Sequence, residues 1–114
     1  MNVKCEKKKL RKALEDEQEC VRAYGRDMAK RIYLRLNQLS AADNLGVFWP
    51  PLSLPNRCHE LKGDRKGVFS MDLVQPYRLL FKAVGEPDPP PEDQRLRWLG
   101  IETVEIIGIE DTHG

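Results

Sequence analysis

Hydrophobic residues in the first 40 positions recur at the spacing of helices. Leu10 and Leu14 lie four residues apart in a basic segment and predict a first helix. The acidic segment 15–19 suits the N-terminal end of a second helix, and Gly25 predicts a break after it. A third helix then extends to about residue 40, because apolar side chains recur every three or four positions. These side chains are Tyr24, Met28, Ile32, Leu36 and Leu39.

From residue 57 onward, apolar positions alternate with polar ones, which is the period of a β-strand. The pattern predicts four strands, over residues 57–61, 68–74, 77–84 and 103–111. The last of these is apolar on both faces, which is typical of a strand inside a sheet. A short segment at residues 2–6 predicts a further strand ahead of the helices.

Two proline-containing segments separate these elements. Residues 46–56 hold three prolines and predict an irregular connector, which Phe48, Trp49 and Leu52 anchor on the core. Residues 85–96 hold four prolines and many acids and predict a long exposed loop. The glycine-flanked polar segment 62–67 predicts a turn between two strands.

The order of elements predicts the fold class. We expect an α+β fold in which the N-terminal helices pack on a twisted antiparallel sheet of four to five strands. The length of 114 residues is near the commonest size of one domain, so residues 1–114 are expected to form a single domain. One sheet face then remains free to carry a concave polar site.

Charge is unevenly distributed along the chain, although the net charge is only +1. Residues 1–40 carry a net charge of +5, and residues 87–114 carry −5. A polyanion would therefore be attracted to the N-terminal half of the molecule rather than to the whole of it.

The three cysteines are odd in number and widely spaced, so we expect free thiols rather than a disulfide framework. We expect no metal site and no cofactor, because a zinc site needs about four convergent ligands and no CxxC motif occurs. No apolar run is long enough to span a bilayer, and the N-terminal segment is too charged for a signal peptide. A cytoplasmic protein with no membrane partner is expected.

Residues with useful chemistry gather on the predicted strands and turns. The chain has two histidines, His59 within one strand and His113 after the last. If they share a site, they match what RNA cleavage requires, because imidazole can take the proton of the ribose 2′-hydroxyl or protonate the 5′-oxygen. A strand histidine is more often structural, however, and the turn 62–67 is also ordinary hairpin chemistry. Basic side chains suited to phosphate are Arg57, Lys62, Arg65, Lys66 and Arg78.

Two segments resemble a known family. Residues 56–81, NRCHELKGDRKGVFSMDLVQPYRLLF, and the C-terminal VEIIGIEDTHG resemble the RelE/ParE superfamily of bacterial toxins. The likeness is greatest to the HigB-type "killer" branch of type II toxin–antitoxin systems. That branch carries a similar Asn-Arg-x-His strand, a GDRKG turn, an arginine-bearing strand and an ending like Asp-Tyr-His. The resemblance covers residues 32–114 apart from the proline-rich loop.

The resemblance implies a fold of helices on a twisted antiparallel sheet and a metal-independent endoribonuclease that cleaves mRNA on the ribosome. It also implies a cognate antitoxin, usually a helix-turn-helix protein. By motif match, the catalytic residues would be His59, Asp111 and His113. By the same match, phosphate would be bound by Arg57, Lys62, Arg65 and Arg78. Lys66, by its charge, and Thr112, by its hydroxyl group, complete the set expected to bind RNA or phosphate.

One position departs from the family pattern. Thr112 stands where the family commonly has a tyrosine, which can stack on an RNA base. Threonine cannot stack, although it can donate a hydrogen bond. Two alternatives therefore stay open: a ParE-like toxin directed at DNA gyrase, and a catalytically weakened binding module on the same fold. The sequence also leaves open which histidine is the acid and which the base.

Overall fold

The computed structural model describes residues 1–111, which form an α+β fold with four α-helices and a five-stranded sheet. Thr112 and His113 lie outside the described residues. The elements are β1 (Asn2–Lys4), α1 (Lys8–Glu15), α2 (Glu17–Tyr24), α3 (Arg26–Ala41), η1 (Leu45–Phe48), β2 (His59–Glu60), η2 (Gly63–Arg65), β3 (Val68–Asp72), β4 (Tyr77–Ala83), α4 (Gln94–Leu99) and β5 (Thr103–Asp111).

The three helices predicted in the N-terminal part are confirmed. Asp16 begins α2, because its carboxylate accepts hydrogen bonds from the backbone N–H groups of Gln18 and Glu19. Gly25 separates α2 from α3 with a φ of 85°, in the region that favours glycine. The predicted break is therefore a change of backbone direction that an L-residue adopts only with strain.

The sheet has the order β1-β5-β4-β3-β2 and is mixed, which corrects the expectation of a wholly antiparallel sheet. The four strands β2 to β5 form an antiparallel meander, but β1 pairs in parallel with β5. The nitrogen of Met1 donates to the carbonyl oxygens of Leu39 and Ser40 at the end of α3, and β1 starts beside the first residue of β5, Thr103.

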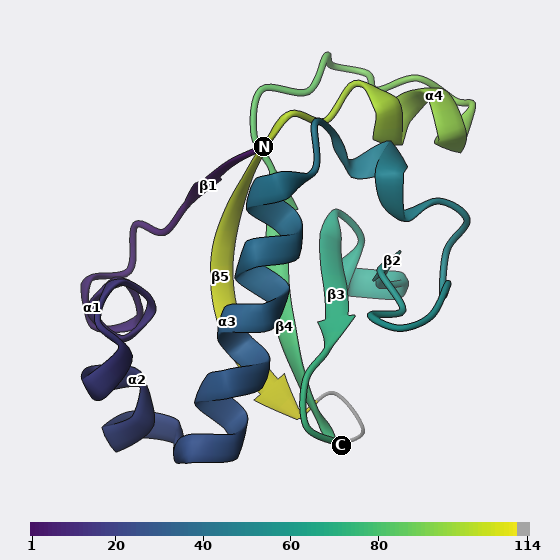
Figure 1. Cartoon of the computed structure of the whole chain (residues 1–114). Coiled ribbons are helices and arrows are strands. Elements are labelled where there is room, and N and C mark those ends of the chain that lie inside the picture. Colours follow the sequence, from purple (N-terminus) through teal and green to yellow (C-terminus); the bar gives the residue numbers. More distant parts are fainter. Residues whose placement is uncertain (112–114) are drawn as a thin grey trace.

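The helix α3 covers one face of the sheet, while α1 and α2 lie to one side of it (Figure 1). Ile32 and Leu39 of α3 belong to the same buried core as Phe69 and Phe81 of the sheet. The strand β5 lies inside the sheet, as its apolar faces predict. All five residues of β3 are buried, so both faces of this strand are covered.

The segment 85–96 is not wholly a loop, which is a second correction. Asp93 accepts hydrogen bonds from the N–H groups of Arg95 and Leu96 and so begins α4. Trp98 of this helix is buried between Trp49 and Phe69, with ring centroids 5.1 and 5.6 Å away. The connector 46–56 is therefore anchored through Phe48 and Trp49, as predicted, whereas Leu52 is 47% exposed and does not join the core.

The predicted strand 57–61 is also shorter than expected. Only His59 and Glu60 pair with β3, because Arg57 has a φ of 52° and turns the chain out of the extended conformation. The turn at 62–67 forms the single 3₁₀ turn η2.

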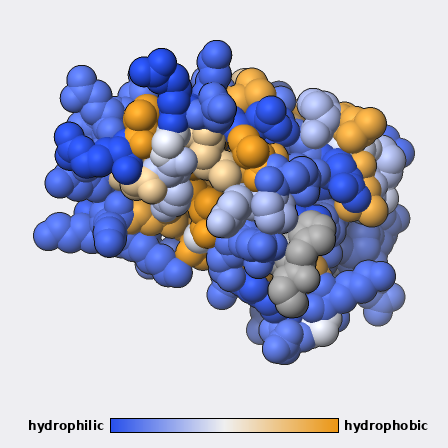
Figure 2. All heavy atoms as spheres, turned by 90° about the horizontal axis from the view of Figure 1, so that it is seen from below, coloured by the Kyte–Doolittle hydropathy of each residue, from blue (hydrophilic) through white to orange (hydrophobic). Residues whose placement is uncertain are grey.

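The surface viewed from below in Figure 2 is mostly hydrophilic, with small hydrophobic areas. Within residues 1–111, no helix is both long enough and apolar enough to cross a membrane.

Replacement of Gly25 tests how far the connection between α2 and α3 depends on a glycine at this position. Gly25→Ala should lower the free energy of unfolding by about 1–3 kcal/mol, because alanine is strained at this φ. Urea denaturation followed by circular dichroism measures the change. Gly100→Ala is the control, since Gly100 has an ordinary φ of −85° and an added methyl group would meet normal contacts. Equal stability of the two variants would contradict the prediction.

Candidate functional site

Strand pairing places a set of polar residues on the sheet face opposite α3. His59 pairs with Ser70, and Ser70 pairs with Leu80. Two residues further along β3, Asp72 pairs with Arg78, which pairs with Glu110. Paired residues share a face, and so do alternate residues of one strand. We call this surface the polar face; the opposite face carries Phe69, Met71 and Phe81 into the core.

His59 is held in one orientation at the edge of the sheet. Its Nδ1 lies 2.8 Å from the carbonyl oxygen of Arg57. A carbonyl oxygen can only accept, so Nδ1 carries the proton in the neutral ring and Nε2 presents a lone pair. This tautomer makes His59 suited to accept a proton from a bound hydroxyl group.

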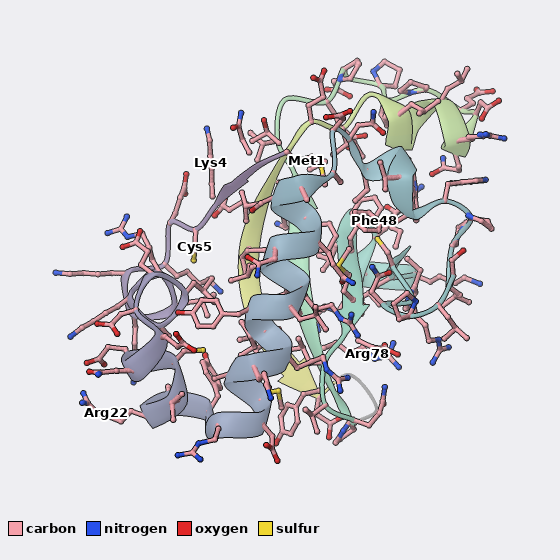
Figure 3. All side chains as sticks on the ribbon, viewed as in Figure 1. Met1, Lys4, Cys5, Arg22, Phe48 and Arg78 are labelled. Carbon is pink, nitrogen blue, oxygen red and sulfur yellow. The ribbon has the colours of Figure 1, made fainter. Side chains whose placement is uncertain are left out.

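Asp72 lies between two arginines on the polar face. Its Oδ2 is 3.6 Å from Nη1 of Arg57, and its Oδ1 is 3.7 Å from Nε of Arg78. The Asp72 side chain is 9% exposed, whereas that of Arg57 is 41% exposed. The carboxylate of Asp72 is thus the buried part of the cluster, and the guanidinium of Arg57 reaches the solvent. Figure 3 labels Arg78 toward the lower end of the sheet.

Several buried polar atoms in this cluster have unused hydrogen-bonding capacity. Within residues 1–111, no hydrogen bond is made by Oγ of Ser70, Oδ1 of Asp72 or Nε of Arg78. Buried polar atoms are normally satisfied, and exceptions call for an explanation such as a bound polar group or water. Ser70 and Asp72 were not recognised from the sequence as residues of the candidate site. The available signal was that polar residues occupy alternate positions of an otherwise apolar strand.

Arg65 is directed across the polar face rather than toward His59. It forms a two-pronged ion pair with Glu110 of β5, at 3.1 and 3.3 Å. This hydrogen bond is also the main reason that the pKa of Glu110 is lowered. Because η2 precedes β3 and Glu110 lies two strands beyond, the bridge crosses the polar face, on which Ser70 and Leu80 are completely buried. The polar face is therefore less open than the sequence suggested.

A cavity of about 530 Å³ lies beside His59 at the sheet edge. Lys62 and Lys66 line it together with His59. Both lysines are exposed, so they add positive charge to the mouth of the cavity.

The strand register does not bring Asp111 to His59. Asp111 pairs with Tyr77. It lies two residues after Ile109 and therefore on the same face of β5, the face that packs toward α3. Across the sheet, the residue of β5 that lies in line with His59 is Gly108. Asp111 lies three residues further along β5, so three strand spacings and three residues separate it from His59. This corresponds to on the order of 17 Å between their Cα atoms. The predicted contributions of Thr112 and His113 lie outside the described residues.

A second charged cluster, also missed in the sequence, supports the loops around the cavity. Arg97 of α4 donates from Nε and Nη2 to the carboxylate of Glu86, and from Nη1 to Glu60 at 2.7 Å. Its guanidinium lies 5.3 Å from the centre of the Phe69 ring. The hydrogen bond to Glu86 is the main cause of the raised pKa of Arg97. Glu60 in turn accepts from the N–H of Gly67, which fixes the end of the 62–67 turn.

The cysteines are free, as predicted. Cys20 and Cys58 are buried, and burial raises the pKa of the Cys58 thiol to about 12. Among residues 1–111, no group of three or more His, Cys, Asp or Glu side chains is arranged to hold a metal ion.

The Arg97 cluster should be essential to stability. Arg97→Met keeps an apolar stem over Phe69 but leaves the carboxylates of Glu60 and Glu86 without their cation. We expect the free energy of unfolding to fall by about 3 kcal/mol, since removing one partner from a buried ion pair is costly. Urea denaturation at neutral pH is the measurement.

Arg22→Met provides the matched control for Arg97→Met. Arg22 pairs with Glu19 on the surface and its side chain is 73% exposed, so its loss should change stability by less than about 1 kcal/mol. A similar effect of the two substitutions would show that the Arg97 cluster has no special importance.

The chain was compared with models of protein families and with curated proteins, and neither comparison gives a match.

Proposed function

We propose that this protein is the toxin of a type II toxin–antitoxin system, with a RelE/ParE-like fold, and that it cleaves mRNA on the ribosome without a metal ion. The observation that supports this most directly is the position of His59, two residues from Arg57 and beside the cluster of Arg57, Asp72 and Arg78. It combines a proton acceptor with cations that suit a phosphate group. The resemblance of residues 56–81 to the HigB-type branch is the second support.

The proposed reaction begins with the 2′-hydroxyl of the RNA. Nε2 of His59 accepts its proton, while the 2′-oxygen attacks the adjacent phosphorus. Negative charge builds up on the phosphate oxygens, and the guanidinium groups of Arg57 and Arg78 stabilise it. The bond to the 5′-oxygen then breaks, and this oxygen takes up a proton. The products are a 2′,3′-cyclic phosphate and a free 5′-hydroxyl.

The proposed proton donor comes from the C-terminal segment. His113 is assigned this part, with Asp111 as its companion and Thr112 as a hydrogen-bond donor to the RNA. His59 is assigned the base, because its Nδ1 already donates to a carbonyl oxygen. Lys62, Arg65 and Lys66 are assigned to flanking phosphates. The action belongs to the cytoplasm, where ribosomes translate.

Substitution of His59 tests the proposed chemistry without removing its structural hydrogen bond. Asparagine can still donate to the carbonyl of Arg57 but has no group at the position of Nε2. His59→Asn should therefore fold normally and cleave mRNA in a translation extract roughly 100-fold or more slowly than the wild type. His113→Ala should lose activity to a similar degree. The 5′ ends of cleaved mRNA, mapped by primer extension, give the rates.

Arg22→Met is the control for activity, because Arg22 lies on α2, away from the polar face. It should cleave at the wild-type rate. Intact mRNA in the presence of folded, antitoxin-free wild-type protein would exclude the proposed reaction. Growth arrest that persists when both histidines are replaced, with inhibited DNA supercoiling, would favour the gyrase-directed alternative instead. Absence of growth arrest would favour the binding module.

The proposed protein partner is a cognate antitoxin of the helix-turn-helix type. Exposed basic side chains on α1 suit an acidic antitoxin segment: Lys8, Lys9, Arg11 and Lys12. Replacement of Lys9 and Lys12 by glutamate should weaken the complex roughly tenfold at low salt. The difference should shrink as salt is added. Isothermal titration at several salt concentrations measures this, and a salt-insensitive complex would indicate an apolar interface.

A further inference from the structure

The cavity beside His59 has a size and a lining that differ from the rest of the polar face. Its volume of about 530 Å³ is within the range of ligand pockets. It is bounded by the connector 49–52, by β2 and the turn after it, and by α4. Its lining is mainly apolar and includes two tryptophans, Trp49 and Trp98, together with Leu52.

The aromatic wall of the cavity is rigid. Trp98 is 2% exposed and packs edge-to-face on Phe69, whose ring stacks on that of Phe81. Trp49 packs on Trp98 with an angle of 88° between the rings, and it remains partly exposed. A partly exposed ring held against a buried one offers a stacking surface that loses little entropy on binding.

The charges around the cavity favour a nucleotide over a neutral apolar ligand. Lys62 and Lys66 are exposed at its mouth, and neither forms an ion pair within the part of the chain that the structure describes. Glu60 also lines the cavity, but its carboxylate is bound by Arg97 and by the N–H of Gly67. The charge left uncompensated is therefore positive, as phosphate requires.

We propose that this cavity binds the base of the nucleotide that carries the attacking 2′-hydroxyl, stacked on Trp49, an assignment that rests on the proposed function. His59 lines the cavity on one side and adjoins the arginine cluster on the other. A ribose at Nε2 of His59 thus has its 3′-phosphate toward Arg57 and its base toward Trp49. Residues 103–114 contain no Phe, Tyr or Trp, whereas the connector offers the partly exposed ring of Trp49 at the cavity.

A binding assay with an uncleavable probe tests this inference separately from catalysis. The probe is a fluorescent single-stranded hexanucleotide with 2′-O-methyl groups, which cannot attack the phosphate. Trp49→Leu should bind it roughly tenfold more weakly than the wild type, because leucine fills space but cannot stack. Trp49→Phe should stay within about threefold, since an aromatic ring remains. Phe48→Leu is the control: it is the neighbouring aromatic residue but does not line the cavity.

Probes that lack one base at successive positions locate the contact. At one position, loss of the base should weaken binding to the wild type roughly tenfold but leave binding to Trp49→Leu nearly unchanged. Thermal denaturation confirms that each variant is folded. The inference is overturned if the wild type does not bind the probe, if Trp49→Leu binds as the wild type does, or if no position shows this coupling.

Cleavage assays separate this inference from the proposed function. If the wild type binds the probe through Trp49 but leaves mRNA intact, the proposed reaction is contradicted and the base pocket is supported. If the wild type cleaves mRNA and Trp49→Leu has the same kcat and KM, the base pocket is contradicted and the proposed reaction is supported.

Discussion

The backbone of Asp72 is the point at which the helices and the candidate site are joined. Its N–H donates to the carbonyl of Asn56 at 2.8 Å, and its carbonyl accepts from Nε of Arg35 at 2.6 Å. Asn56 is itself held, because its side chain accepts from the N–H of Cys58. Since Arg57 and His59 follow Asn56 directly, their positions depend on these hydrogen bonds. A buried arginine of α3 is thus hydrogen-bonded to the same residue that binds the backbone just before the polar groups of the sheet edge.

The side chain of Asp72 also contributes to the balance of charge on the polar face. Burial lowers the pKa of Arg35, a nearby Arg31 lowers it further, and the carboxylate of Asp72 opposes both. That one carboxylate also faces Arg57 and Arg78. On the polar face the carboxylates of Asp72 and Glu110 stand against three guanidinium groups, those of Arg57, Arg65 and Arg78, so these groups together keep a net positive charge. An anion bound there would complete the balance of charge, which supports the proposed phosphate ligand over a neutral one.

Local patterns predicted the parts of the fold that depend on neighbouring residues. The break at Gly25 and the length of α3 follow from spacing within a few turns, and the pairing of β3 with β4 follows from a short turn. The helix α4 was missed because its six residues, which follow four prolines, are too few to show the hydrophobic period of a helix. Asp93 is nevertheless a typical N-cap residue. Arg57 and His59 are two residues apart in the sequence, whereas Asp72 reaches Arg57 only through tertiary structure. Asp111 was grouped with His59 by motif match alone, and the separation between them is set by the strand register, which spacing along the sequence does not reveal.

Strain gives a further reason to place function at the edge of the sheet. The described residues other than glycine that have a positive φ are Leu52, at 69°, and Arg57, at 52°. Leu52 lines the cavity beside His59, and Arg57 belongs to the arginine cluster on its other side. Such conformations are costly and persist where the surrounding structure holds them. A regular strand over 57–61 would avoid the cost at Arg57, but it would also extend β2 into the space where the chain now turns. The short β2 leaves His59 between a cavity and a cationic cluster, and the strained conformations of Leu52 and Arg57 accompany that arrangement.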